Sequence, residues 1–163
     1  MISWGMAERG IEIVRNTRRR YDGEKRNPWD EAECGHHYAR AMSAWSTVLA
    51  LSGFSYDGPS ASVSALPPHF ENEFRCLWAT GTGWGTFSLN GGSGNTRFTL
   101  KVLSGTLACR SCQIASSGNT AAVRLANKTI DSRIERGDKT CKVIFPEIVR
   151  ASVGDSIEVE VRT

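Results

Sequence analysis

Apolar positions repeat at helical spacing near the start of the chain. The pattern predicts a first helix over residues 3–21 and a second helix over residues 36–52. In the second helix, apolar residues lie almost all round the circumference. Such a helix belongs inside a larger structure, because no side of it is suited to water. We therefore expect residues 36–52 to leave an exposed apolar surface unless another element covers them.

Strand-like patterns dominate the chain from residue 97 onward. The segments that alternate or carry β-branched runs are residues 97–102, 106–109, 121–126, 128–130, 141–145 and 156–161. A turn is expected at Asn127, between two of these segments. Together they predict an antiparallel sheet or a small sandwich.

The stretch between the helical and strand-like regions is rich in residues that favour turns. Residues 53–68 contain many Gly, Ser and Pro residues, which predicts a long loop. A short helix is predicted over residues 71–78, and a flexible turn over residues 90–95. Trp84 lies between two glycines, a setting more typical of packing than of a platform for a sugar ring.

The composition is that of a globular protein, with 163 residues of which 40% are hydrophobic and 23% are charged. The net charge of +3 comes partly from a basic cluster near the end of the first predicted helix: Arg18, Arg19, Arg20, Lys25 and Arg26. Cations suit the negative end of a helix dipole, and neither aromatic interleaving nor a binding motif accompanies the cluster. We therefore expect a solvated helix end and no nucleic-acid partner.

Targeting signals are missing from the sequence. No stretch reaches the ~20 apolar residues that span a bilayer. Residues 1–14 lack the basic start and apolar core of a signal peptide. These absences favour a cytoplasmic location, although a fragment would have its targeting sequence upstream, and membrane association is left open.

The chain has five cysteines. Cys109 and Cys112 form a CxxC pair, but the second ligand pair of a structural zinc site is missing. A redox pair is expected at the start of a helix, whereas this pair lies in a strand-rich stretch. We therefore expect ordinary buried or half-buried thiols, and neither a metal nor a cofactor.

Residues 27–42 concentrate the polar chemistry of the chain. Pro28 favours an extended conformation before it and Gly35 permits a sharp turn, so a loop is predicted to lead into the second helix. The candidate pocket residues are Asp30, Glu31, Glu33, His36, His37 and Arg40. A carboxylate accepts paired hydrogen bonds from sugar hydroxyls, and a guanidinium donates in a fixed fork. An ion pair that only pins the loop is the alternative for Glu31 and Arg40.

Three segments of the sequence resemble a known family. They are residues 27–42 (NPWDEAECGHHYARAM), residues 43–56 (SAWSTVLALSGFSY) and residues 73–88, which contain GWGTFS. Over residues 7–88 the chain is similar to the C-terminal part of glycoside hydrolase family 116, the non-lysosomal glucosylceramidase and β-glucosidase group. In that family a β-sandwich domain precedes an (α/α)6 barrel, and the enzymes are retaining β-glycosidases.

The resemblance implies roles for two residues of the polar loop. Glu31 and Arg40 match a glutamate and an arginine that bind sugar hydroxyls in the family. The resemblance implies nothing equally firm for Glu33, His36 or His37, and the two histidines are expected to be structural because no third metal ligand is evident. The predicted fold class is α+β. Residues 1–88 would supply the terminal helices of an (α/α)6 barrel with the sugar-pocket loop, and residues 89–163 a small antiparallel β-sheet or sandwich.

The region that carries the family's nucleophile and general acid/base is missing from this chain. Retaining glycosidases need two carboxyl groups ~5 Å apart. Glu31 and Glu33 alternate in an extended loop, so they would project to opposite sides and form no such pair. We therefore expect no catalytic residues and no activity from this chain alone.

Two functions remain open at this point. In the first, the chain is the C-terminal fragment of a retaining β-glycosidase and contributes sugar-binding residues. Its partners would be a β-linked sugar, such as a glucoside, and the rest of the catalytic domain. In the second, it is a stand-alone carbohydrate-binding or protein-interaction module whose sheet binds. The lack of a polar face on the second predicted helix favours the fragment.

Overall fold

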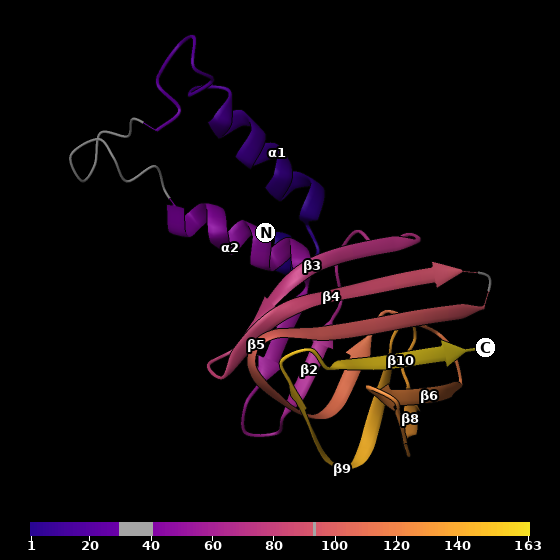
Figure 1. Cartoon of the computed structure of the whole chain (residues 1–163). Coiled ribbons are helices and arrows are strands. Elements are labelled where there is room, and N and C mark those ends of the chain that lie inside the picture. Colours follow the sequence, from indigo (N-terminus) through magenta and orange to yellow (C-terminus); the bar gives the residue numbers. More distant parts are fainter. Residues whose placement is uncertain (30–40, 93) are drawn as a thin grey trace. The chain divides into compact units, whose positions relative to one another are not determined.

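The structure, a computed structural model, describes residues 1–29, 41–92 and 94–163, without the side chains of residues 41–43. It divides into two compact units, Met1–Leu51 and Ser52–Thr163. The first unit is helical and the second is built from strands (Figure 1). None of the helices in the described residues is long and apolar enough to span a bilayer.

The described part of the first unit contains three short helices. They are η1 (Ile2–Trp4), α1 (Ala7–Arg18) and α2 (Ala41–Ser52). Gly5 ends η1 in the left-handed conformation, with a φ of 78°, and so divides the predicted helix over residues 3–21. A Cβ on Gly10 would come within 2.4 Å of Ile2 Cγ1, so the absence of a side chain at Gly10 lets η1 lie close to α1.

The predicted barrel helices are wrong. Among the described residues there are two α-helices of 12 residues each, and strands occupy most of the chain from Phe54 to Arg162. The barrel was implied by the resemblance to family 116, and the all-round apolar pattern of α2 indicates only that a helix needs covering, not which element covers it. The pattern was informative in one respect, since Trp45, Val48 and Leu49 of α2 are exposed, as we expected.

The second unit consists of two sheets that share one long strand. Sheet I contains β3 (Glu73–Ala79), β4 (Gly83–Gly92), the first half of β5 (Asn95–Ile114), β10 (Ser156–Arg162), β6 (Thr120–Leu125) and β7 (Lys128–Ile130), in that order. Sheet II contains β1 (Phe54–Asp57), β2 (Ser62–Ala65), the second half of β5, β9 (Cys141–Ser152) and β8 (Arg133–Arg136). The described pairs are antiparallel except β2 with β5.

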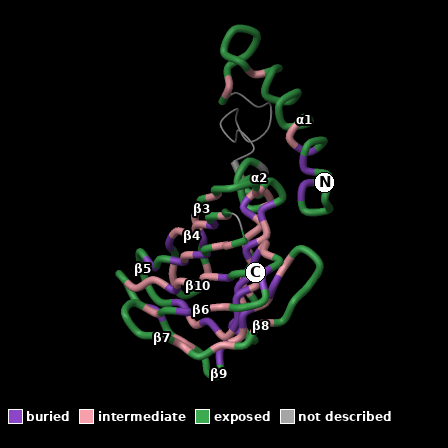
Figure 2. Tube along the Cα trace, turned by 90° about the vertical axis from the view of Figure 1, so that its right-hand side faces the viewer, coloured by how far each residue is buried: buried purple, intermediate pink, exposed green. Residues whose placement is uncertain are grey.

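Strand β5 passes from sheet I to sheet II at Gly105. This glycine has a φ of 72°, and residues 103–106 are all exposed. On either side of the crossing, buried and less buried positions alternate along the strand, as Figure 2 shows for the sheets as a whole. The inward side chains of both sheets form a single hydrophobic core. The unit is therefore a β-sandwich in which β5 makes a corner.

Aromatic side chains fill the core under β4. Phe87 lies 5.6 Å from Phe54, 5.9 Å from Phe74 and 6.3 Å from Phe98, measured between ring centroids. Trp78 is fully buried beside this cluster, and its indole Nε1 donates a hydrogen bond to the carbonyl oxygen of Lys101 at 3.1 Å. Its only polar hydrogen is therefore satisfied inside the core.

The predicted strands are confirmed, and the turn at Asn127 joins β6 to β7. Two predictions earlier in the chain are wrong. Residues 53–68 form the β1–β2 hairpin and not a long loop, and residues 71–78 mostly form β3 and not a helix. Both segments alternate between more and less buried positions, a signal that their Gly, Ser and Pro content and their charged residues obscured.

Gly85 of β4 lies against the backbone of β5. A Cβ on this residue would come within 1.9 Å of the Lys101 carbonyl oxygen and 2.8 Å of Trp78 Nε1. We expect Gly85→Ala to lower the free energy of unfolding by about 3 kcal/mol, because neither the ladder nor the buried indole can move away. Urea denaturation of the variant and the wild type measures this loss.

The matched control is Gly92→Ala at the far end of the same strand. A Cβ at Gly92 would meet nothing within 4 Å. This variant should unfold within about 1 kcal/mol of the wild type. Equal losses of unfolding free energy in the two variants would show that the close approach of the backbones at Gly85 does not determine the stability of the core.

Candidate functional site

The site residues predicted from sequence lie outside the described residues. This holds for Asp30 and for Glu31, Glu33, His36, His37 and Arg40. Sugar binding by Glu31 and Arg40 therefore stays a prediction. Candidate sites in the described part of the chain lie on the outer face of sheet I and at the end of α1.

The outer face of sheet I is mostly polar, although Leu77 and Trp84 also lie on it. Its residues come from five adjacent strands and alternate with the buried core positions: Glu73, Arg75, Trp84, Thr86, Ser88, Asn90, Arg97, Thr99, Lys101, Arg124, Glu158 and Glu160. Strand pairing aligns them in rows, so that Thr99 is paired with Ser88 on one side and with Glu158 on the other. The face therefore presents hydroxyl, amide and charged groups side by side.

Trp84 is the large apolar side chain at one end of this face. It is 51% exposed, so the expectation that it packs in the core is wrong. Its paired residues are small, Ala79 on β3 and Ser104 on β5, and Gly83 and Gly85 flank it along β4. None of these four residues has a side chain large enough to cover the indole ring, which is left open to solvent.

The glycines beside Trp84 are explained by backbone packing. A Cβ on Gly83 would come within 2.6 Å of the Ser104 carbonyl oxygen and 2.8 Å of the Thr106 nitrogen. Next to them, Thr82 Oγ1 donates to the carbonyl oxygen of Thr106 at 2.9 Å, and Thr80 Oγ1 donates to that of Gly83 at 3.2 Å. The hydrogen bond from Thr82 joins the turn before Trp84 to β5, and the one from Thr80 closes the turn itself. The backbone that carries the exposed ring is therefore held in place.

Glu160 is the centre of a charged network on β10. Asn95 Nδ2 donates to Glu160 Oε1 at 3.0 Å, Arg162 Nη2 lies 3.1 Å from Oε2, and Arg97 Nη2 lies 3.7 Å from Oε1. The hydrogen bond from Asn95, followed by that from Arg162, lowers the pKa of the Glu160 carboxyl group. This carboxylate remains ionised at neutral pH, and its environment is unsuited to a general acid.

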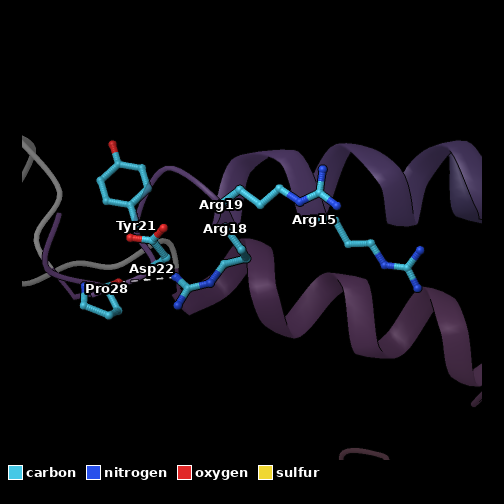
Figure 3. A pocket seen from close by; sticks show the side chains of 6 residues that line it. All are labelled: Arg15, Arg18, Arg19, Tyr21, Asp22 and Pro28. Carbon is cyan, nitrogen blue, oxygen red and sulfur yellow. Dashed lines mark hydrogen bonds between the residues drawn. The ribbon is translucent and has the colours of Figure 1, made fainter. Parts of the chain in front are cut away.

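A cationic hollow lies at the C-terminal end of α1 (Figure 3). Its volume is about 410 Å³, and its lining residues are Arg15, Arg18, Arg19, Tyr21, Asp22 and Pro28. Arg18 Nη1 donates to the Pro28 carbonyl oxygen at 3.3 Å, whereas the guanidinium groups of Arg15 and Arg19 point away from Pro28 (Figure 3). Arginines in this position stabilise the negative end of the helix dipole.

Asp22 closes the loop after α1. Its Oδ1 accepts hydrogen bonds from the backbone nitrogens of Lys25 at 2.9 Å and Glu24 at 3.1 Å, and Lys25 Nζ lies 3.0 Å from Oδ2. The contacts with Lys25 lower the pKa of Asp22 to about 2. Asp22, the acidic residue that lines the hollow, is therefore engaged in hydrogen bonds within the loop. These hydrogen bonds account for the conformation of the loop without a ligand.

Metal binding finds no support in the described residues, where no three His, Cys, Asp or Glu side chains gather closely enough to hold an ion. Of the predicted candidate residues, none can be placed in a site, and Trp84 is the functional candidate that sequence reasoning set aside. Its exposure follows from tertiary pairing with small residues on β3 and β5, which no local signal reveals.

Comparison with known proteins adds little to this picture. No family model matches the chain, and no curated protein matches its sequence significantly. Among solved structures, an α-L-rhamnosidase from Dictyoglumus thermophilum aligns with a TM-score of 0.39 and 10% sequence identity. The alignment covers 69% of this chain and 12% of the rhamnosidase chain. This is a distant likeness to a glycoside hydrolase, too weak to establish a shared fold, and no family model supports the resemblance to family 116 specifically.

The network around Glu160 makes stability depend on pH in a defined direction. Its pKa is lower in the folded protein than the ~4.3 expected of an unfolded glutamate. The stabilisation is therefore present above the unfolded pKa and is lost as the pH falls through the folded pKa. We expect the difference in unfolding free energy between wild type and Glu160→Gln to shrink as the pH falls below about 4.

Urea denaturation at a series of pH values measures this difference. The control is Glu158→Gln, which removes a carboxylate from the same strand and leaves the contacts of Glu160 with Asn95 and Arg162 in place. A difference for Glu160→Gln that stays constant with pH would contradict the assignment.

Proposed function

We propose that the second unit is a carbohydrate-binding β-sandwich and that Trp84 is the platform on which a sugar ring stacks. The observation that carries the proposal is the exposed indole of Trp84 among small neighbours. An exposed indole among small neighbours presents a flat apolar surface on which a ligand with an apolar face can stack. A pyranose ring has such a face, formed by its C–H groups.

The polar residues beyond Trp84 suit the rest of the ligand. Thr86 and Ser88 follow Trp84 on the outer side of β4, and Lys101 is paired with Thr86. From Trp84 to Ser88 the strand extends about 13 Å, which is enough for an oligosaccharide of two or three rings. Hydroxyl and ammonium groups along this line can exchange hydrogen bonds with sugar hydroxyls.

The proposed module binds sugar without cleaving it. Hydrolysis requires one carboxyl group that gives up a proton to the leaving oxygen. On the polar face, Glu160 is held in the ionised state by Asn95 and Arg162 and is unsuited to this role. The resemblance of residues 7–88 to the glucosylceramidase and β-glucosidase group supports a β-linked glucoside as the ligand and a glycoside hydrolase as the parent protein. Sugar binding by Glu31 and Arg40 stays a separate prediction.

Titration of the whole chain with cellobiose and longer β-linked gluco-oligosaccharides tests the proposal. Chemical shifts of the tryptophan indole N–H groups report which ring is covered, and calorimetry gives the affinity. We expect Trp84→Ala to weaken binding at least tenfold, or about 1.4 kcal/mol. Trp4→Ala is the matched control, because Trp4 is 85% exposed but lies on η1 in the first unit.

Each alternative outcome has a clear meaning. Unchanged binding by Trp84→Ala would reject the platform. Loss of binding only in Glu31→Gln and Arg40→Gln would assign sugar recognition to these two residues, which lie outside the described part of the chain. Turnover of an aryl β-glucoside by the purified chain, abolished by Glu31→Gln, would reject a purely binding role.

A further inference from the structure

The two cysteines of the CxxC pair lie side by side in the core. In a regular strand, residues three apart face opposite sides and their Cα atoms are about 10 Å apart. Here Cys109 and Cys112 are both fully buried, and their Sγ atoms are 3.5 Å apart. Strand β5 is therefore irregular at this point.

The irregularity is a break in the pairing of β5 with β9. Cys109 is paired with Val149, but Ser111 is paired with Ile144, so one residue of β5 faces four residues of β9. Arg110 bridges this break by donating to the Pro146 carbonyl oxygen. Of the four extra residues of β9, Phe145 is buried in the core and residues 146–148 are exposed. The result is a bulge that directs both thiols into the same interior space.

We propose that Cys109 and Cys112 are a redox modification site that closes reversibly to an intrachain disulfide. A disulfide has an S–S length of about 2.05 Å, so the two sulfur atoms need to approach by about 1.5 Å. The two thiols give up two protons and two electrons as the S–S bond forms. A small-molecule disulfide such as oxidised glutathione takes them up and is cleaved to two thiols, by way of a mixed disulfide on one cysteine.

Burial makes this site slow to react and hard to reduce once oxidised. The hydrogen bond with Cys109 and burial raise the pKa of the Cys112 thiol well above its usual value. The thiolate is the attacking species, so reaction requires local opening. The bulge is a suitable place for such opening, because residues 145–148 of β9 are not paired with β5 there.

The other described cysteines provide internal controls. Cys141 is buried and Cys76 is half-buried, and neither is within hydrogen-bonding distance of another cysteine in the described part of the chain. Cys141 is therefore a control for burial. Among the described cysteines, two thiols lie close together at Cys109 and Cys112.

The test is equilibration of the folded, full-length chain in glutathione buffers of increasing oxidised fraction. Acid quenching, alkylation of free thiols and mass spectrometry of the peptides follow. We expect the peptides containing Cys109 and Cys112 to lose two hydrogen atoms and to resist alkylation, while Cys76 and Cys141 remain alkylated. Circular dichroism of each sample establishes that the chain stays folded.

Two sets of variants make the result specific. Cys112→Ser should abolish the loss of two hydrogen atoms, and Cys76→Ser and Cys141→Ser should leave it unchanged. If Cys112→Ser unfolds, the same peptide map of the wild type still decides the question. Full alkylation of both thiols in every buffer, oxidation only in denaturant, or disulfides to other cysteines would each overturn the proposal.

Discussion

The sandwich depends on a single strand that belongs to both of its sheets. Strand β5 has 20 residues, far more than the 3–10 typical of a strand in a globular domain. It turns at Gly105, which has a positive φ, and a Cβ there would come within 2.2 Å of the Thr82 carbonyl oxygen. Residues on both sides of this corner point into the same core. Strands β4 and β10 pair with the half of β5 before the corner, and β2 and β9 pair with the half after it. Without the corner, the two sheets would share no strand.

The candidate binding platform is a consequence of the same constraint. The turn between β3 and β4 packs against β5 close to the corner, and Gly83 and Gly85 allow the two backbones to meet. Trp78 points inward at this place and donates to Lys101, whereas Trp84 points outward between the two glycines. The small residues that the close packing requires are therefore the ones that leave the Trp84 ring uncovered.

Part of this architecture was accessible from the sequence. Alternation predicted β10 and β6 almost to the residue, because their inward positions face a core and their outward positions face solvent. The two halves of β5 were predicted as separate strands, since Gly105 interrupts the pattern although it does not end the strand. Sequence reasoning failed for β1 and β2, where glycine, serine and proline outweighed the alternation, and for β3, where charged residues obscured it. The barrel prediction, implied by the resemblance to family 116, was wrong, and the apolar second helix could not correct it because its pattern shows that a partner is needed and not what the partner is.

The CxxC pair illustrates why a site can be invisible to local reasoning. Spacing along an extended strand places Cys109 and Cys112 on opposite faces, and the sequence around them contains nothing that predicts a bulge. The bulge arises from the partner strand, where Phe145, Pro146, Glu147 and Ile148 are inserted opposite Arg110. Pro146 has no N–H to donate to a ladder, which favours a break in pairing at that position. The distance between the two sulfur atoms is thus set by residues more than thirty positions away, and only the register of the assembled sheet brings the thiols together.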